Sequence, residues 1–200
     1  MSEKLYKEKR FANYREIVNY AADTYKDKAA FQIRDKAQGG YRFISYEEVR
    51  DYYYALCAAF IEKGYKGKRI AIMGKNSCEW SLCYLAASTV GCVVPIDKEV
   101  SAEDASEFMK SAECVAMISD KKLSAAVSAV GYKADYYDFS FVWDCVLNVS
   151  DSRKKKSMQL SSLRTSVRFS SSLQEQQETL RVYVCHSTRY AQIFIQQYRQ

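Results

Sequence analysis

The chain has 200 residues, 48% of them hydrophobic, and a formal net charge of +6. This length suits a single domain, or one domain with a tail. Charged residues occur throughout residues 1–10, and no stretch approaches the roughly 20 apolar residues of a membrane-spanning helix. We therefore expect neither a secretory signal nor a transmembrane segment.

The cysteines and the single histidine argue against two kinds of stabilising site. Seven cysteines are scattered along the chain without a C-x-x-C pair, and His186 is the only histidine. Structural zinc sites are built from closely spaced cysteines and histidines, and disulfide frameworks use an even number of cysteines. Neither is expected here, and reduced thiols in a cytoplasmic protein fit better.

The positive charge is confined to the C-terminal quarter of the chain. Residues 151–200 contain nine Lys or Arg against three Asp or Glu, whereas residues 1–150 contain 21 of each sign. A protein that binds a polyanion is expected to carry a basic surface on its folded part. We therefore expect no nucleic-acid partner.

The first expected elements are a helix and a short strand. Asn13, with Glu16 three residues later, has the pattern of a helix N-cap, and apolar residues at helical spacing follow it. Residues 35–40 are rich in turn formers, and the pattern of residues 41–44 predicts a short strand.

Three units of helix and strand follow with short connections. Ser45 and Glu48 form a capping-box pattern, Asn76 with Glu79 repeats it, and Ser101 opens a third helix. The pattern predicts helices near residues 45–63, 76–90 and 102–112, and strands near 69–73, 92–96 and 115–119. Helices that alternate with buried strands predict an α/β fold with a parallel sheet and flanking helices.

The C-terminal part of the sequence has a different composition. All seven glycines lie at or before Gly131, and Pro95 is the only proline. Residues 151–200 contain neither and are rich in Ser and Gln, although globular α/β chains use Gly and Pro at turns and caps. We therefore expect an N-terminal α/β subdomain over residues 1–135 and a poorly ordered tail over residues 136–200.

Five segments carry a family pattern in a fixed order. They are residues 43–49 (FISYEEV), 64–72 (GYKGKRIAI), 76–80 (NSCEW), 85–86 (LA) and 91–97 (GCVVPID). Each segment alone is an ordinary cap, turn or strand, but their order and spacing are specific. The stretch over residues 11–122 resembles the N-terminal subdomain of the adenylate-forming superfamily, closest to the AMP-forming long-chain fatty acid–CoA ligases.

This resemblance implies a two-step ligation. In the family, a fatty acid attacks the α-phosphate of ATP, with Mg²⁺ present, to give an acyl-adenylate, and coenzyme A then displaces AMP. The family's phosphate-binding loop has the form T-S-G-x-T-G-x-x-K-G, whose backbone N–H groups and lysine hold phosphate. The sequence lacks this loop and the family's later motifs. The resemblance therefore implies a truncated and inactive fragment that has no catalytic, cofactor-binding or metal-binding residues and binds none of these cofactors.

Two groups of residues within the resemblance have a structural interpretation. Trp80 and Tyr84 stand one helical turn apart and are expected to anchor their helix on the sheet. Residues 97–99 (DKE) form an exposed polar cluster at a strand's C-terminal end, where α/β ligand sites tend to lie. We interpret them as a solvated loop.

Residues 172–182 permit a second reading of their codons. When the same nucleotides are read one base earlier, the allowed codons permit T-S-G-A-T-G-N-x-K-G, which is the missing phosphate loop in its expected place. We therefore interpret the tail as an out-of-frame translation of a synthetase gene, with the slip between about Ala125 and Ser157. The same hypothesis explains the absence of Gly and Pro from the tail.

Other readings of the chain remain open. One is a non-catalytic α/β binding module that uses its basic tail to bind a partner or a membrane. Separately, residues 153–156 (RKKK) fit either a nuclear signal or phosphate-binding patch or a solvated charge run, and the solvated run is favoured. Another is a dinucleotide-binding Rossmann unit, but Gly74-Lys75-Asn76 is not the glycine-rich fingerprint of that fold.

Overall fold

The computed structural model describes residues 9–35, 39–153, 181–184 and 193–196. Its helices are α1 (Tyr14–Tyr25), α2 (Tyr46–Glu62), α3 (Cys78–Val90), α4 (Ala102–Ser111), α5 (Lys121–Val130) and α6 (Ser140–Arg153). Its strands are β1 (Ala29–Asp35), β2 (Gly40–Ser45), β3 (Arg69–Met73), β4 (Cys92–Ile96), β5 (Cys114–Ser119), β6 (Asp135–Asp138), β7 (Arg181–Val184) and β8 (Ile193–Gln196).

The centre of the fold is a parallel sheet with the strand order β4-β3-β5-β6. Ile72 of β3 is in register with Pro95 of β4 on one side and with Ile118 of β5 on the other. All three strand pairs are parallel. The α/β fold with a parallel sheet that the sequence predicts is confirmed.

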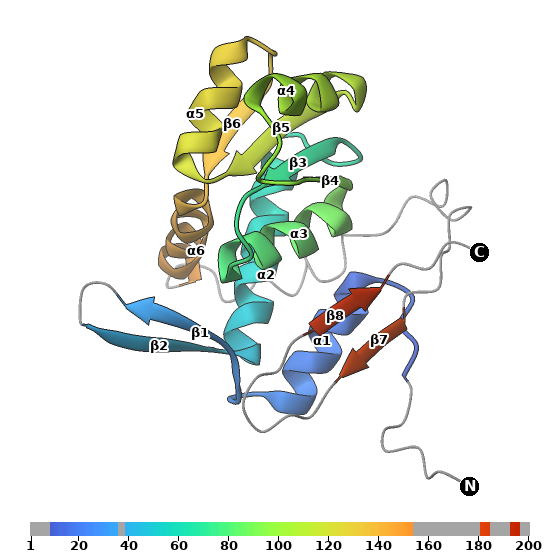
Figure 1. Ribbon diagram of the computed structural model, residues 1–200. Helices are drawn as coiled ribbons and strands as arrows, with labels where there is room; N and C mark the ends of the chain where they lie inside the picture. Colours follow the sequence, from blue (N-terminus) through green and yellow to red (C-terminus); the bar gives the residue numbers. More distant parts are fainter. Residues whose placement is uncertain (1–8, 36–38, 154–180, 185–192, 197–200) are drawn as a thin grey trace, which may run out of the picture.

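Helices cover both faces of this sheet, because side chains along each strand alternate between two cores (Figure 1). Ile70 and Ile72 of β3 belong to the core under α2, α3 and α6. Ala71 and Met73 of the same strand belong to the core under α4 and α5. A strand buried on both faces reads as a continuous apolar run, as the RIAIM sequence of β3 does.

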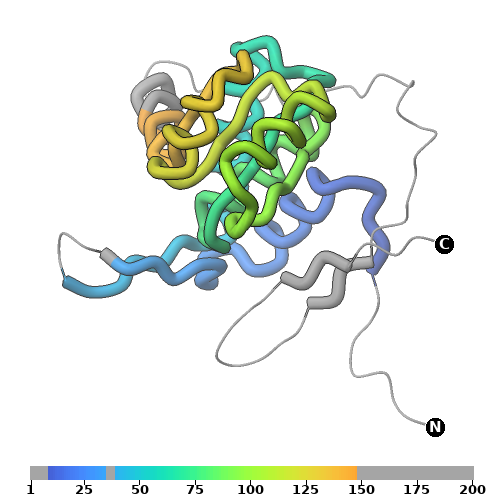
Figure 2. The backbone as a smooth tube through the Cα atoms, turned by 45° about the horizontal axis from the view of Figure 1, so that its top comes forward, coloured from blue at the N-terminus to red at the C-terminus, as the bar shows by residue number. Residues whose placement is uncertain are grey.

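A hairpin of β1 and β2 projects away from this three-layered body, as two views of the chain show (Figures 1 and 2). The two strands pair antiparallel and belong to no larger sheet among the described residues. Ile44, at the base of the hairpin, is fully buried, and Phe31 and Ile33 pack against the same core. One face of the hairpin therefore rests on the body.

Three of the four expected helix caps are found where the sequence places them. The side chains of Asn13, Ser45 and Ser101 accept hydrogen bonds from backbone N–H groups of the first turn. The fourth prediction was wrong by one residue, because Ser77 and not Asn76 caps α3 and accepts from Trp80 N at 3.1 Å.

The folded part continues beyond the boundary expected at residue 135. Strand β6 pairs with β5, and helix α6 packs on α2 with Val142 fully buried. The boundary was therefore placed too early. Although this segment has no Gly or Pro, β6 is held by its pairing with β5 and α6 by the burial of its apolar face. Residues 154–180, 185–192 and 197–200 of the expected tail lie outside the described residues.

The capping box of α2 gives a pH-dependent prediction. Glu48 Oε2 accepts from Ser45 N at 2.8 Å, and Glu48 N donates to Ser45 Oγ at 3.2 Å. Burial alone raises the pKa of Glu48, but hydrogen bonds from Ser45 and Tyr52 and the charge of Arg42 hold it below its usual value. A carboxylate with a lowered folded-state pKa contributes stability above its unfolded pKa and loses it as pH falls through the folded one.

Glu48→Gln should therefore lower the free energy of unfolding by about 1 kcal/mol at neutral pH. The difference from the wild type should shrink in acid, where Glu48 itself is protonated. Urea titrations at neutral and acidic pH measure it, and Glu47→Gln in the same helical turn is the control. A difference that is the same at both pH values would contradict the assigned role of the carboxylate.

Candidate functional site

The geometry of a parallel sheet indicates where a ligand site can form. Strand β3 continues through α3 to β4 on one side, and β5 continues through α5 to β6 on the other. The connections diverge between the C-terminal ends of β3 and β5, and ligands of open α/β sheets bind at such a point. Gly74 and Lys75 follow β3 at this edge, and Asp120 follows β5.

This point of divergence is filled by side chains of the chain itself. A Cβ on Gly74 would lie 2.7 Å from Phe139 Cε2 and 3.0 Å from Asp120 Oδ2. The backbone N–H of Lys75 donates to the same carboxylate oxygen at 3.4 Å. An aromatic ring and a carboxylate therefore occupy the space beside the backbone of Gly74.

The other polar groups at this edge are engaged in local turns. Asp138 Oδ1 accepts from Ser140 N at 2.8 Å, and the hydroxyl and amide of Ser140 hold the pKa of Asp138 below its usual value. The buried Ser119 donates through Oγ to Asp120 O at 3.2 Å. Asp138 thus satisfies a backbone N–H at the start of α6, and none of these groups is arranged as an acid–base pair.

The polar cluster after β4 has the geometry of an exposed turn. Asp97 Oδ1 accepts from Glu99 N at 2.9 Å, and the ammonium of Lys98 pairs with the carboxylate of Glu99. All three residues are exposed. The interpretation of residues 97–99 as a solvated loop agrees with this geometry.

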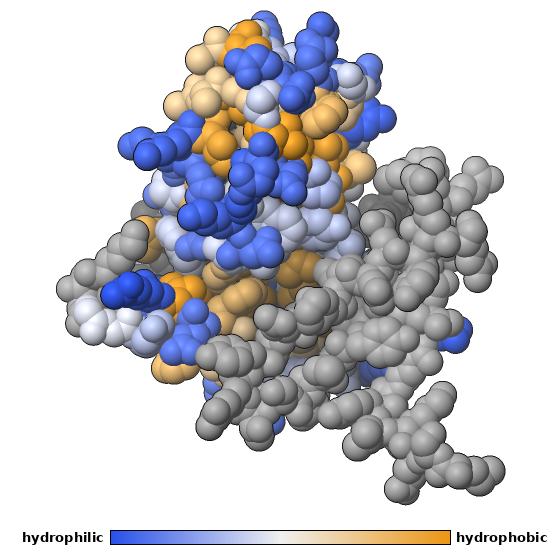
Figure 3. Space-filling view, in the orientation of Figure 1, coloured by the Kyte–Doolittle hydropathy of each residue, from blue (hydrophilic) through white to orange (hydrophobic). Residues whose placement is uncertain are grey.

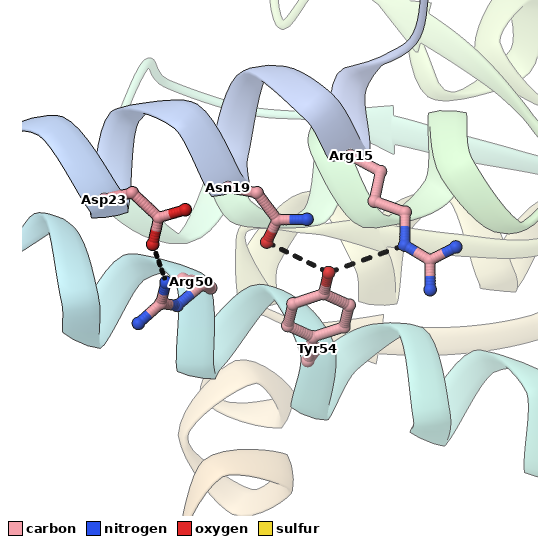
Figure 4. Close-up of a pocket in the computed structure, with 5 residues that line it drawn as sticks. All are labelled: Arg15, Asn19, Asp23, Arg50 and Tyr54. Atoms are coloured by element: carbon pink, nitrogen blue, oxygen red, sulfur yellow. Dashed lines mark hydrogen bonds and ion pairs between the residues drawn. The ribbon is translucent and has the colours of Figure 1, made fainter. Parts of the chain in front are cut away.

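A polar pocket lies between α1 and α2, lined by Arg15, Asn19, Asp23, Arg50 and Tyr54 (Figure 4). Arg50 Nη1 donates to Asp23 Oδ1 at 2.7 Å, and the Tyr54 hydroxyl donates to Asn19 Oδ1 at 3.1 Å. Arg15 Nε lies 3.5 Å from the same hydroxyl. These contacts join one helix to the other, so the pocket is a polar seam that fixes α1 on α2.

Sequence reasoning did not identify this polar seam. The signal was present, because the polar residues of α1 recur every four positions and those of α2 stand four apart, which places each set on one helix face. Arg50 Nε is buried and has no hydrogen-bond partner among the described residues. Arg50 and Asp23 form an ion pair across the two helices, so their charges offset each other.

The aromatic residues singled out in the sequence have structural roles. The rings of Trp80 and Tyr84 stack, with their centroids 5.3 Å apart and an interplanar angle of 21°. Both pack against the core under α2, α3 and α6. Glu79 accepts from the indole N–H of Trp143 at 3.1 Å, which ties α3 to α6. These contacts anchor α3 on that core and on α6.

The six described cysteines are free thiols, and Cys92 is the exposed one. The buried members are Cys57, Cys78, Cys83, Cys114 and Cys145. Burial raises the pKa of each buried thiol, to about 12 for Cys57 and Cys78. A raised pKa lowers the fraction of reactive thiolate, so the buried cysteines are not candidate nucleophiles.

The described part of the chain contains no group of three or more His, Cys, Asp or Glu that could hold a metal ion. None of its helices is long and apolar enough to span a bilayer.

Comparison with known proteins identifies the family. The family model for AMP-binding enzymes matches residues 18–178. No curated protein matches the chain. Three solved structures resemble it at low identity: the inhibitor-bound N-terminal domain of FACL13 from Mycobacterium tuberculosis (TM-score 0.57, 16% identity), a fatty acyl CoA synthetase from the same organism (0.58, 16%) and NpsA from Klebsiella oxytoca in complex with 3-hydroxyanthranilyl-AMSN (0.55, 22%).

Each of these matches covers 68% of this chain, but only 35%, 28% and 26% of the respective structures. The chain therefore corresponds to about a quarter to a third of the length of each of these three proteins. At these identities the structural likeness establishes the fold, and the family model establishes the relationship. The chain belongs to the family of AMP-binding enzymes, and its described part has the fold of the N-terminal region of adenylate-forming proteins.

Proposed function

We propose that this chain is the N-terminal part of an AMP-forming acyl-CoA synthetase and that it is inactive by itself. The match of the AMP-binding family model over residues 18–178 carries the first half of the proposal. The closed edge of the sheet, where Phe139 and Asp120 fill the space beside Gly74, supports the second half. The free thiols of the described part suit a cytoplasmic protein.

The proposed substrates of the intact enzyme are a fatty acid, ATP and coenzyme A. Support comes from the pattern of segments between residues 43 and 97, which resembles long-chain fatty acid–CoA ligases. A fatty acyl CoA synthetase is also among the similar structures. The adenylate intermediate is the chemistry that the whole family implies, whereas the choice of a fatty acid rests on the resemblance.

The residues at the edge of the sheet do not fit ATP or its magnesium ion. When the fatty acid attacks the α-phosphate, negative charge builds up on the phosphate oxygens. Stabilising this charge requires fixed N–H donors, a cation and a metal ion. At the point of divergence the carboxylate of Asp120 accepts from Lys75 N, where a phosphate would need that donor. A carboxylate in this position repels a triphosphate, so no step of the reaction is assigned to these residues.

The purified chain is therefore expected to show no ATP–pyrophosphate exchange with any fatty acid, with Mg²⁺ and coenzyme A present. Loss of one oxyanion-type donor alone costs about a hundred- to a thousandfold in rate, and the chain lacks the whole phosphate loop. A protein made from the gene with the frame restored and its downstream sequence included should regain exchange. Acyl-adenylate formed by the 200-residue chain would contradict the proposal.

A separate measurement addresses the out-of-frame tail. The nucleotide sequence past codon 125 should contain a reading frame that encodes the phosphate loop near codons 172–182. The slip is proposed to lie between about Ala125 and Ser157. A gene without that second frame would remove the explanation of the tail while leaving the family assignment intact.

A further inference from the structure

The last strand of the parallel sheet and the turn after it lie near the surface of the body. We call residues 135–141, which comprise β6, Phe139 and the start of α6, the strap. No residue of the strap is buried, whereas Ile118 of the neighbouring β5 and Val142, directly after the strap, are fully buried. Segments with few buried apolar contacts open at a lower free energy than the core of a fold. The strap is therefore expected to open more easily than β3 and β5.

The helices beside the strap leave apolar side chains in contact with solvent. Helix α5 packs against β6, and α4 packs against α5. Phe108 of α4 and Val130 of α5 are 52% and 44% exposed. The space-filling view shows hydrophobic residues among hydrophilic ones around these two helices (Figure 3). The apolar cover on this side of the body is therefore incomplete.

Tyrosine hydroxyls fix the strap to its surroundings. The Tyr65 hydroxyl, in the turn before β3, donates to the carboxylate of Asp135 and lies 3.1 Å from the Tyr137 hydroxyl. Tyr65 itself is 4% exposed and belongs to the core under α2, α3 and α6. The Tyr136 hydroxyl donates to Tyr132 O at 2.9 Å. Water can replace such polar contacts when a segment opens, so they hold the strap without committing it to the core.

The ammonium of Lys63 lies over two rings of the strap. Lys63 Nζ is 4.8 Å from the centroid of the Tyr137 ring and 5.5 Å from that of the Phe141 ring. Lys63 is exposed and directly follows α2. Its hydrogen bond with the Tyr137 hydroxyl raises the pKa of Lys63, and the charge of Asp135 adds to this effect. The side chain is thus a cation at neutral pH, and a cation is attracted to the face of an aromatic ring.

The two rings that Lys63 contacts flank the residue that closes the edge of the sheet. Phe139 stands between Tyr137 and Phe141 in the chain, and its ring fills the space beside Gly74. Both flanking rings pack only partly buried against the core under α2, α3 and α6. Displacement of the strap from Lys63 would carry Phe139 away from Gly74.

The strap lies between two anchored points of the chain. Before it, α5 ends at Gly131 with a φ of +99°, and after it the buried Val142 holds α6 on the body. We propose that the strap opens while the rest of the fold stays intact, that Lys63 and Tyr65 hold it closed, and that its opening uncovers the point of divergence beside Gly74. The proposal does not depend on the ligase assignment, and no substrate of that reaction enters its test.

Amide hydrogen exchange of the full chain tests independent opening. The hydrogen-bonded amides of β6 should exchange faster than those of β3. Low concentrations of urea should accelerate exchange in β3 more than in β6, because local opening exposes less surface than global unfolding. Equal rates in the two strands would mean that the strap opens only when the whole fold unfolds, and this result would overturn the proposal.

Four variants test which side chains hold the strap closed. Lys63→Gln should raise exchange in β6 about threefold, because the side chain stays polar but loses its charge. Lys63→Arg, which keeps a cation, should stay close to the wild type. Tyr65→Phe should raise exchange about tenfold, because it removes the hydroxyl that meets Asp135 and Tyr137. Lys66→Gln, an exposed lysine in the turn that follows α2, is the matched control and should change nothing. Exchange in β3 should be the same in all four.

Thiol labelling gives a second readout at the edge of the sheet. In a Phe139→Cys variant, Cys92 and Cys185 are also changed to Ser, so the other thiols of the described part are buried. A maleimide should modify the introduced thiol about threefold faster when Lys63→Gln is added. An unchanged rate would show that Lys63 does not hold the strap. Exchange that rises in β3 together with β6 would show that the variants weaken the whole fold. Either result would overturn the proposal.

Discussion

Replacing Gly91 by Ala should lower the free energy of unfolding by about 3 kcal/mol. A Cβ at this position would lie 2.2 Å from Lys68 O and 3.1 Å from Lys68 N. Both atoms belong to the backbone, so rotation of a side chain cannot relieve the contact. A loss of this size is a large share of the roughly 5–15 kcal/mol by which domains are stable.

The backbone around Gly91 is held on both sides and has little freedom to move. Cys92 N donates to Lys68 O at 2.9 Å, and Gly67 N donates to Val90 O at 3.0 Å. These bonds bring the end of α3 against the turn that precedes β3. Separating the two segments to make room for a methyl group would break at least one of them and disturb the start of both strands.

Urea denaturation of Gly91→Ala beside Gly40→Ala measures this effect. Gly40 has open space around its Cβ position and no left-handed backbone angle, so its substitution should cost nothing. The midpoint for Gly91→Ala should fall well below that of the wild type, and the midpoint for Gly40→Ala should not. Matching midpoints for the two variants would show that the turn before β3 yields easily.

The second large effect is expected at Gly74, where Gly74→Ala should cost about 2 kcal/mol. Its φ of +154° is a conformation that residues with a side chain rarely adopt. The new methyl group would also meet the ring of Phe139 at 2.7 Å. Unlike the contact at Gly91, this one involves a side chain that substitution can remove.

A double-mutant cycle separates the two sources of strain at Gly74. In a Phe139→Ala background the cost of Gly74→Ala should be smaller by about 1 kcal/mol, because only the backbone strain remains. Urea midpoints of the wild type, both single variants and the double variant provide the cycle. Additive effects would mean that Phe139 moves aside without cost and does not close the edge of the sheet.

Local signals made the body of the fold predictable. Ser45 and Glu48 are three residues apart, so the capping box that starts α2 could be read directly from the sequence. The apolar run of β3 and the proline near the end of β4 gave strands within a residue of those observed. Asn76 was mistaken for the cap of α3 because Asn76 and Ser77 are both good N-cap residues, and only backbone geometry distinguishes them.

The elements that were missed depend on distant partners. The sequence of β6, Asp-Tyr-Tyr-Asp, has no apolar run, and its place in the sheet depends on β5 and on Tyr65. The Tyr65 hydroxyl donates to the carboxylate of Asp135 and lies 3.1 Å from the Tyr137 hydroxyl. These partners are about seventy positions apart in the chain, so no local window could show them. Strand β1 was also not expected, since its pairing with β2 is what defines it.

The candidate site was less accessible to sequence reasoning than the fold. The sequence shows that Gly74 and Lys75 follow a strand. It does not show that Phe139, between β6 and α6, lies beside Gly74, because that contact depends on how β6 joins the sheet. Phe139 also lies within residues 136–200, which we expected to be a poorly ordered tail and so did not consider part of the site. The closure of the edge is thus a property of tertiary packing.

The strand order also has a consequence for synthesis on the ribosome. Strand β3 emerges before the two neighbours that flank it, β4 and β5. Until Ser119 has left the exit tunnel, at least one edge of β3 is unpaired, and Ile70 and Ile72 lack part of their cover. Non-local pairing of this kind folds slowly and exposes apolar surface meanwhile. A nascent chain stalled before β5 should therefore be a substrate for chaperones, whereas one released after α6 should fold on its own.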